Sequence, residues 1–209
     1  MNLSRDVNLY FGKSQSGKSA LLNDVLYDEG NERSIVYDFK NEIDATLRTN
    51  DLNKLYHHCR DGVFFRVVVS DPLLFPALCA MVATMRHVTF GIDEIQTVVM
   101  GSKQLNAALM QLIFVGTKNK ISLHIATQRP GVLHINLRSQ FTKVYTFNQS
   151  EESDRKWIAT ASGSGILFDD VQQLKPHCFV SFTWDGVLQR HAPIVLTRSR
   201  SKKGKEVNA

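Results

Sequence analysis

The chain is poor in the features that mark membrane-spanning and secreted proteins. None of its apolar runs approaches the roughly 18 residues that a membrane-spanning helix needs, and residues 1–6 lack the apolar segment of a signal peptide. It has only three cysteines, Cys59, Cys79 and Cys178, which are far apart and odd in number. This pattern is typical of reduced, structural thiols. We therefore expect the protein to stay in the compartment where it is made.

Excess charge is also scarce outside the C-terminal end. The formal net charge is +5, and residues 198–209 carry five basic residues against one acid, a net +4. The remaining residues are then close to neutral, so the basic isoelectric point does not by itself indicate a nucleic-acid-binding face. Because residues 198–209 also contain few apolar side chains, we expect a disordered basic tail. Such a tail either contacts phosphate backbones or only keeps the protein soluble.

The strongest positive signal is the segment 12–19, GKSQSGKS, which fits the pattern G-x-x-x-x-G-K-[ST]. A β-rich run precedes it at 7–11, and apolar residues with helical spacing follow it at 20–26. A strand, a glycine-bearing loop and a helix start are the context that a phosphate-binding loop requires. Backbone N–H groups of the loop and the positive end of the helix hold the phosphates in such a loop.

This pattern assigns a nucleotide-binding role to every residue of the loop. The predicted binding residues are Gly12, Lys13, Ser14, Gln15, Ser16, Gly17, Lys18 and Ser19. The ammonium group of Lys18 is expected to reach the β- and γ-phosphates, and the hydroxyl of Ser19 to bind Mg²⁺. ATP and Mg²⁺ are therefore the expected cofactors.

Strand-like and helix-like segments alternate through most of the chain. We predict strands at 34–38, 63–69, 87–92 and 122–126, and helices at about 51–60, 73–86 and 103–116, the second with Asp71 as its N-cap. Near-continuous apolar strands that alternate with helices predict an α/β fold with a mostly parallel sheet and helices on both faces. Beyond this part we predict a strand at 142–147, a helix at 151–160 and a C-terminal β-hairpin at 179–190. Residues 1–197 are expected to form one domain.

Polar side chains stand at the ends of two predicted strands. Asp93 closes one apolar strand, Glu94 follows it at once, and Gln128 ends the next strand. Ligands of open α/β sheets bind at the carboxyl ends of the strands. We expect Asp93 to order Mg²⁺, Glu94 to polarise the water that attacks the γ-phosphate, and Gln128 to bond that water and the phosphate.

The distance along the chain from the phosphate loop to the Asp-Glu pair narrows the fold class. Two predicted strands lie between them, which indicates that an extra strand separates the loop strand from the Asp-Glu strand. That arrangement is typical of ATPases that use a glutamate and a sensor strand. The sequence therefore predicts a RecA-like P-loop NTPase of the additional-strand, catalytic-glutamate (ASCE) type.

The segment 126–130, ATQRP, resembles the TQRP signature of the FtsK/HerA superfamily of DNA-pumping ATPases. Other segments agree with this superfamily in order: 36–40 with its Asp-x-Lys ending, 136–147, Asp154-Arg155, and 189–193. One departure is Lys143, which stands where an arginine is frequent. Conjugation and chromosome pumps of this superfamily usually carry membrane anchors or extra domains, and we expect neither here. The chain is then most similar to the genome-packaging ATPases of membrane-containing icosahedral double-stranded DNA viruses.

This resemblance implies a homo-oligomeric ring, a pentamer or a hexamer, that drives duplex DNA through its centre. It also implies that an arginine of one subunit reaches the γ-phosphate bound to the next. Arg155 is the first candidate for this catalytic role and Arg129 the second, followed by Lys143 and Lys120.

DNA contacts of such a ring would be sequence-independent contacts to phosphates. Candidates are Lys103 and Arg138, the latter in the loop 131–140. The resemblance further implies a capsid vertex or membrane proteins as partners, and a location in the host cytoplasm or the virion.

The expected function is thus an ATP-driven double-stranded DNA translocase that packages a viral genome into a preformed capsid. Two alternatives stay open at this point. One is a HerA-like plasmid or cellular DNA pump, or a phage-assembly ATPase that extrudes single-stranded DNA. The other is a nucleotide-gated binding protein with little turnover.

Overall fold

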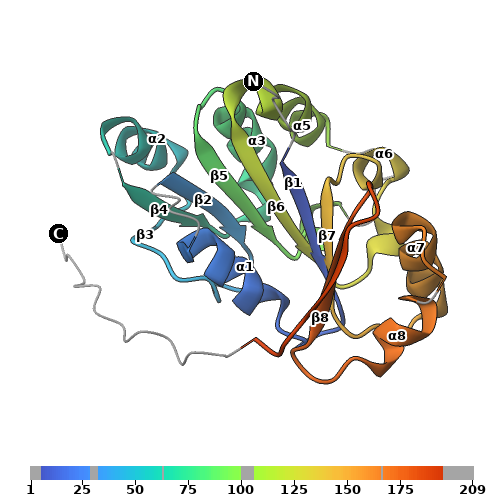
Figure 1. The fold of residues 1–209 in the computed structure, drawn as a ribbon. Helices are drawn as coiled ribbons and strands as arrows, with labels where there is room; N and C mark the ends of the chain where they lie inside the picture. The colour runs from blue at the N-terminus through green and yellow to red at the C-terminus, as the bar shows by residue number, and fades with distance from the viewer. Residues whose placement is uncertain (1–5, 29–32, 63, 100–105, 166, 195–209) are drawn as a thin grey trace.

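A nine-stranded sheet runs through the molecule in the computed structural model, which describes residues 6–28, 33–62, 64–99, 106–165 and 167–194 (Figure 1). The strand order is β3-β4-β2-β5-β6-β1-β7-β8-β9. The strands are β1 (Val7–Phe11), β2 (Arg33–Asp38), β3 (Leu47–Arg48), β4 (Phe65–Val69), β5 (Val88–Asp93), β6 (Ile121–Thr127), β7 (Lys143–Thr146), β8 (Phe179–Thr183) and β9 (Leu188–His191). From β3 to β7 along this order, each strand is parallel to its neighbour. Strand β8 is antiparallel to β7, and β9 is antiparallel to β8.

Helices cover both faces of this sheet (Figure 1). They are α1 (Lys18–Asp28), α2 (Leu52–Asp61), α3 (Phe75–Ala83), α4 (Gln96–Val99), α5 (Ala107–Asn119), α6 (Ile135–Arg138), α7 (Glu152–Ser162) and α8 (Leu167–Gln173), with short 3₁₀ turns at Pro72–Leu74 and Pro130–Val132. The mostly parallel α/β architecture with an antiparallel C-terminal hairpin, expected from the sequence, is confirmed.

Alternate side chains of the buried strands belong to two separate hydrophobic cores, because successive residues of a strand point to opposite faces of the sheet. On β1, Leu9 and Phe11 belong to the larger core with α2, α3 and α5. Tyr10, between them, packs in the smaller core with Leu22 and Leu26 of α1. Helix α1 is therefore held on the face opposite to α3 and α5, directly after the phosphate loop.

The predicted element boundaries differ from the observed ones mainly at helix ends. Asp71 caps as expected, accepting the N–H of Leu73 at 2.9 Å, but it caps a 3₁₀ turn that leads into α3. That helix ends at Ala83 rather than near Arg86. Helix α5 begins at Ala107 with Asn106 as its N-cap. The short elements β3, α4, α6 and α8 were not predicted.

The predicted extra strand is present, and it is β6. It lies between β1, which carries the phosphate loop, and β5, which ends in Asp93. The two strands predicted between the phosphate loop and Asp93, β2 and β4, lie on the far side of β5, together with β3. The inserted strand β6 thus follows Asp93 in the chain, whereas the segment that suggested an extra strand precedes Asp93.

Some predictions fall outside the described residues. They are the basic tail at 198–209, and Lys103 with the start of its predicted helix. Within the described part of the chain, no helix is long and apolar enough to cross a membrane.

A buried polar chain links β1 and β6 at the face that α1 covers. The imidazole of His124 lies 2.8 Å from the hydroxyl of Tyr10 through Nδ1 and 2.8 Å from that of Ser122 through Nε2. The ring of Tyr10 stacks on Tyr145, with centroids 4.6 Å apart. Burial lowers the pKa of His124 to about 4, against an opposing effect of the Asp6 charge. The folded protein therefore holds this histidine in its neutral form.

The lowered pKa of His124 predicts a loss of stability in mild acid. The unfolded chain binds a proton at His124 near pH 6.5 and the folded chain only near pH 4, so the free energy of unfolding falls as pH drops through this window, by up to about 3 kcal/mol. Urea denaturation from pH 7.5 to 4.5 should show a steeper decline for the wild type than for His124→Gln. His57→Gln, which changes an exposed side chain of α2, is the control. Parallel curves for the wild type and His124→Gln would contradict the prediction.

Candidate active site

The loop between β1 and α1 has a backbone that only glycine permits at two positions. A Cβ atom on Gly12 would lie 2.6 Å from Cβ of Phe147 and 2.8 Å from Oγ of Ser16. Gly17 has φ of 109°, in the left-handed region that side chains avoid. The N–H of Ser16 donates to the carbonyl of Lys13 at 3.3 Å and closes the loop into a tight turn. Steric constraints on the backbone thus explain why glycine stands at positions 12 and 17 of the sequence pattern.

Lys18 begins helix α1 and crosses the loop. Its side chain is buried, and Nζ donates to the carbonyl oxygen of Lys13 at 3.1 Å. Burial lowers the pKa of Lys18, although the charges of Glu94 and Asp93 oppose this shift. A buried ammonium group with one neutral acceptor is poorly compensated, so an incoming anion would stabilise it.

Two further features of the loop fit a phosphate group. The first N–H groups of α1 have no acceptor within their own helix and carry the positive end of its dipole. The buried Oγ of Ser16 has no hydrogen-bond partner among the described residues. Phosphate oxygens would supply the acceptors that these donors lack, so the residues present fit a nucleotide phosphate chain.

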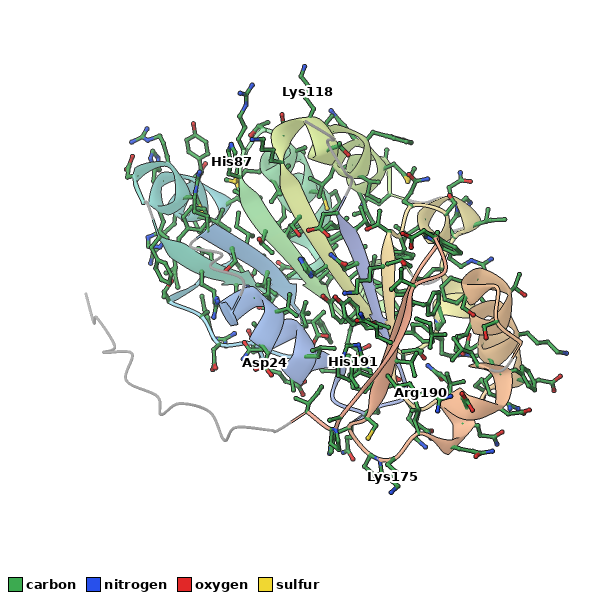
Figure 2. The ribbon with its side chains drawn as sticks, in the orientation of Figure 1. Asp24, His87, Lys118, Lys175, Arg190 and His191 are labelled. Carbon is green, nitrogen blue, oxygen red and sulfur yellow. The ribbon has the colours of Figure 1, made fainter. Side chains whose placement is uncertain are left out.

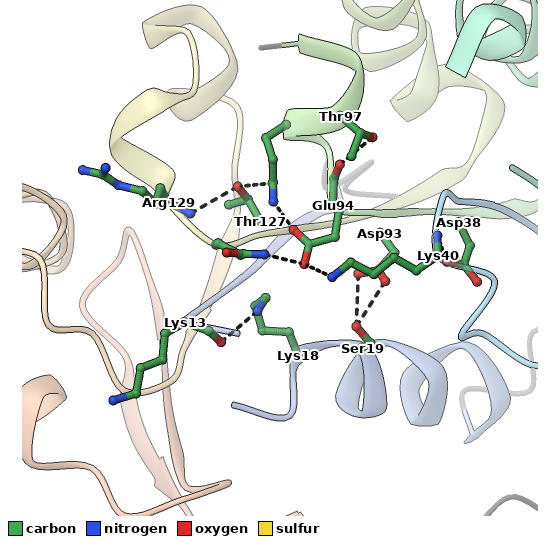
Figure 3. A network of polar contacts seen from close by, with 12 residues as sticks. Lys13, Lys18, Ser19, Asp38, Lys40, Asp93, Glu94, Thr97, Thr127 and Arg129 are labelled. Atoms are coloured by element: carbon green, nitrogen blue, oxygen red, sulfur yellow. Dashed lines mark hydrogen bonds and ion pairs between the residues drawn. The ribbon is translucent and has the colours of Figure 1, made fainter. Parts of the chain in front are cut away.

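Ser19 and Asp93 come together at the carboxyl end of β5. The hydroxyl of Ser19 donates to Oδ2 and Oδ1 of Asp93 at 3.1 and 3.3 Å (Figure 3). Burial raises the pKa of Asp93 to about 6, and repulsion from Asp38 and Glu94 adds to the rise. A hydroxyl and a carboxylate are ligands that Mg²⁺ accepts while it keeps phosphate oxygens and waters in its other positions. This donor set fits Mg²⁺ on a bound nucleotide.

Glu94 is held by three side chains. Its Oε1 accepts from Nζ of Lys40 at 2.9 Å and from Nε2 of Gln128 at 3.0 Å, and its Oε2 accepts from the amide of Gln96 (Figure 3). Its backbone has a φ of 55°, which is uncommon outside glycine. Burial alone would raise the pKa of Glu94, but the contacts with Lys40 and Gln128 and the charge of Lys18 outweigh it and leave this pKa lowered. Glu94 is thus a buried, charged carboxylate.

Gln128 reaches Glu94 because β5 and β6 are neighbours in the sheet. It follows β6 directly, as predicted, and its own carbonyl accepts from Nε2 of Gln149 at 3.1 Å. The hydroxyl of Thr127 donates to Oε1 of Gln96 at 2.8 Å. The ends of β5 and β6 therefore form one hydrogen-bonded unit around the Glu94 carboxylate.

The segment after Gln128 is anchored to helix α7. Asp154 is fully buried; its Oδ1 accepts the N–H of Gly131 at 3.0 Å and its Oδ2 accepts from Nε of Arg129 at 3.4 Å. Arg129 also lies 3.8 Å from Glu151. A Cβ on Gly131 would lie 2.7 Å from Oδ1, so glycine is needed there. Asp154 fixes the course of the segment that carries Gln128.

Arg155 points away from this anchor. One guanidinium nitrogen donates to Oε1 of Gln172 at 2.7 Å and to the carbonyl of Phe168 at 3.4 Å, and the group stacks over the Phe168 ring at 4.3 Å. Glu151 and Asp154, the acids with which Arg155 could have paired, pair with Arg129 instead. Arg155 is thus held against α8 of its own chain.

The lesser basic candidates also have contacts of their own. The ammonium group of Lys143 lies 5.0 Å from the centroid of the Tyr145 ring. Lys120 caps the end of α5 in a left-handed conformation. Sequence reasoning did not place Lys40 and Gln96 in the site. The Asp-x-Lys ending of β2 is the only signal for Lys40, because its partner Glu94 is remote in sequence.

The anchor at Asp154 predicts a change in stability. Asp154→Ala would leave the N–H of Gly131 and the side chain of Arg129 without their buried acceptor, which should lower the free energy of unfolding by about 1–3 kcal/mol. Urea denaturation measures this loss. Glu152→Ala, which breaks an exposed ion pair with Lys156 one turn away, is the matched control and should change little. Equal effects of the two substitutions would show that Asp154 anchors nothing.

No protein-family model and no curated protein matches the chain, but solved structures resemble its fold. The genome packaging NTPase B204 from Sulfolobus turreted icosahedral virus 2, in complex with sulfate, has a TM-score of 0.76 at 21% identity, covering 93% of this chain and 99% of that one. The same protein in complex with ATP-gammaS gives the same score and identity. The cytoplasmic domain of the Thermomonospora curvata type VII secretion ATPase EccC has a TM-score of 0.57 at 11% identity, over 90% of this chain and 23% of that one. The chain therefore has the fold of P-loop NTPases.

Proposed function

We propose that the protein is an ATPase that drives double-stranded DNA into a viral capsid. The observation that carries the catalytic part is one site that unites the phosphate loop with Lys18, the Ser19–Asp93 pair, and the held carboxylate of Glu94. The packaging part is supported by the likeness to the NTPase B204, which extends over nearly the full length of both chains. The TQRP segment that ends in Pro130 agrees with a place in the FtsK/HerA superfamily.

Each residue of the site has a task in hydrolysis. Lys18 and the loop N–H groups hold the β- and γ-phosphates and offset their charge. Ser19 and Asp93 hold Mg²⁺, which supplies further charge neutralisation at the phosphates when it is bound. Glu94 accepts the proton of the attacking water, a contribution typically worth 10²–10⁴ in rate. Gln128 donates to Glu94 and fixes the direction in which the carboxylate faces.

The oligomer and the partners follow from the same likeness. We infer a homo-oligomeric ring, a pentamer or a hexamer, that grips the phosphate backbone of duplex DNA without reading its sequence. Arg138 of α6 is a candidate contact. The ring would act in the host cytoplasm at the packaging vertex of a forming virion, with capsid or membrane proteins as its docking partners.

The experiment that tests this function measures ATP hydrolysis with and without nucleic acid. Duplex DNA of any sequence should raise the rate several-fold. Glu94→Gln should lower the rate by about 100-fold or more and keep ATPγS binding, because the phosphate loop is intact. Lys18→Ala should lose ATPγS binding as well. A rate of ATP hydrolysis that no nucleic acid changes would contradict the translocase function. Stimulation by single-stranded DNA alone would favour an extrusion ATPase.

The arginine supplied by a neighbouring subunit can be tested by mixing. If Arg155 acts on the next subunit, it must leave Gln172 and Phe168, and Arg155→Ala should lower hydrolysis by at least about 100-fold without loss of ATPγS binding. Mixing Arg155→Ala with Glu94→Gln subunits should then restore part of the rate, because an intact Glu94 meets an intact Arg155 across the interface. The same mixture made with Arg129→Ala is the comparison. If the rate recovers only in the mixture of Arg129→Ala with Glu94→Gln subunits, the role belongs to Arg129.

A further inference from the structure

The loop after β2 is built to fix the position of Lys40. The buried carboxylate of Asp38 accepts the N–H of Lys40 at 3.1 Å and that of Ile43 at 2.7 Å. From the other side, the guanidinium of Arg48 donates to Oδ1 of Asn41 at 3.2 Å and to the carbonyl of Ile43. Four contacts within so short a loop leave its backbone little freedom. The direction in which the Lys40 side chain leaves the loop is therefore set by the fold.

That side chain crosses the carboxyl edge of the sheet and enters the phosphate site (Figure 3). Its Nζ is 2.9 Å from Oε1 of Glu94, whose side chain is 4% exposed, whereas that of Lys40 is 38% exposed. Gln128 bonds the same oxygen. With two donors on Oε1 and Gln96 on Oε2, the carboxylate is almost saturated. In this pose Glu94 is poorly placed to take a proton from a water molecule.

The charges around Lys40 favour a phosphate as its second partner. Lys18 and Lys40 both act on Glu94 and Asp93, and the two ammonium groups repel each other across the site. A triphosphate on the loop would bring several negative charges into this space. Lysine is a compact charge on a flexible stem with three donors, so it can change partners without movement of its backbone. Lys40 is thus positioned to leave one anion for another.

We propose that Lys40 holds Glu94 in a resting pose in the nucleotide-free protein and moves to the terminal phosphate when ATP binds. One acceptor position of Glu94 Oε1 is thereby released for the attacking water, while Gln128 stays on the same oxygen. Lys40 is then a positioning residue for Glu94 and a second phosphate-binding lysine beside Lys18, and it distinguishes ATP from ADP. This inference rests on the proposed ATPase function and adds to it a residue that ties hydrolysis to the presence of the third phosphate.

Nucleotide binding tests the second partner. Calorimetry with ATPγS and with ADP should show that Lys40→Met weakens ATPγS binding about tenfold and ADP binding less than about twofold. Lys40→Arg should keep most of the discrimination. Lys118→Met is the matched control: Lys118 lies in the last turn of α5, at the amino end of the parallel strands and away from the site (Figure 2). Equal losses for both nucleotides, or no loss, would overturn the inference.

A stability cycle tests the resting contact without any nucleotide. Lys40→Met should lower the urea midpoint of the wild type, because it leaves the buried charge of Glu94 without its cation. The same substitution in a Glu94→Gln background should lower the midpoint much less. Equal shifts in the two backgrounds would show that the pair does not form in solution, and would overturn the resting pose.

The outcomes separate this inference from the function on which it rests. If the wild type does not bind ATPγS, the ATPase proposal and the role of Lys40 fail together. If the wild type binds it and Lys40→Met binds it equally well, only the role of Lys40 fails. A Lys40→Met protein that keeps its ATPγS affinity but loses stimulation by DNA would assign the ammonium group to DNA phosphates, and would overturn the terminal phosphate as its partner.

Discussion

Two carboxylates that follow each other in sequence and are both buried set the conditions for the rest of this structure. Asp93 and Glu94 are 1% and 3% exposed, and like charges so close together in a poorly solvated place are costly. The surroundings reduce this cost by different means. Asp93 has a raised pKa and a hydroxyl donor in Ser19, whereas Glu94 remains charged and takes an ammonium group and two amides. Adjacent acids thus acquire separate chemical characters, one suited to a metal ion and one to a proton.

The sheet order makes this division possible. Because β6 is inserted between β1 and β5, Gln128 at the end of β6 lies next to Glu94, while Ser19 of the phosphate loop reaches Asp93. The same strand continues into the segment that Asp154 anchors to α7. Helix α7 packs on α8, so the C-terminal third of the chain is connected to the Glu94 carboxylate through a short series of hydrogen bonds. A series of hydrogen bonds thus runs from the Glu94 carboxylate toward the outer helices.

The parts of the site that the sequence predicts are those set by local pattern. The spacing from Gly12 to Ser19 defines the loop by itself, and the strand ends that carry Glu94 and Gln128 are visible as polar residues after apolar runs. The sequence did not place Lys40 in the site because its role depends on a partner, Glu94, that only sheet pairing brings near it. Asp154 was considered only as a neighbour of Arg155, whereas its bonds go to a distant loop. Elements such as β3 and α6 are too short to produce a periodic signal.

The outer margins of the sheet carry a consequence for solubility. One margin is β3, only two residues long, and the other is β9, four residues that carry the charged Arg190 on an exposed hairpin (Figure 2). Unpaired backbone at a long, flat margin invites another chain to add as a further strand and so begins fibre growth. Margins this brief offer little template for such pairing.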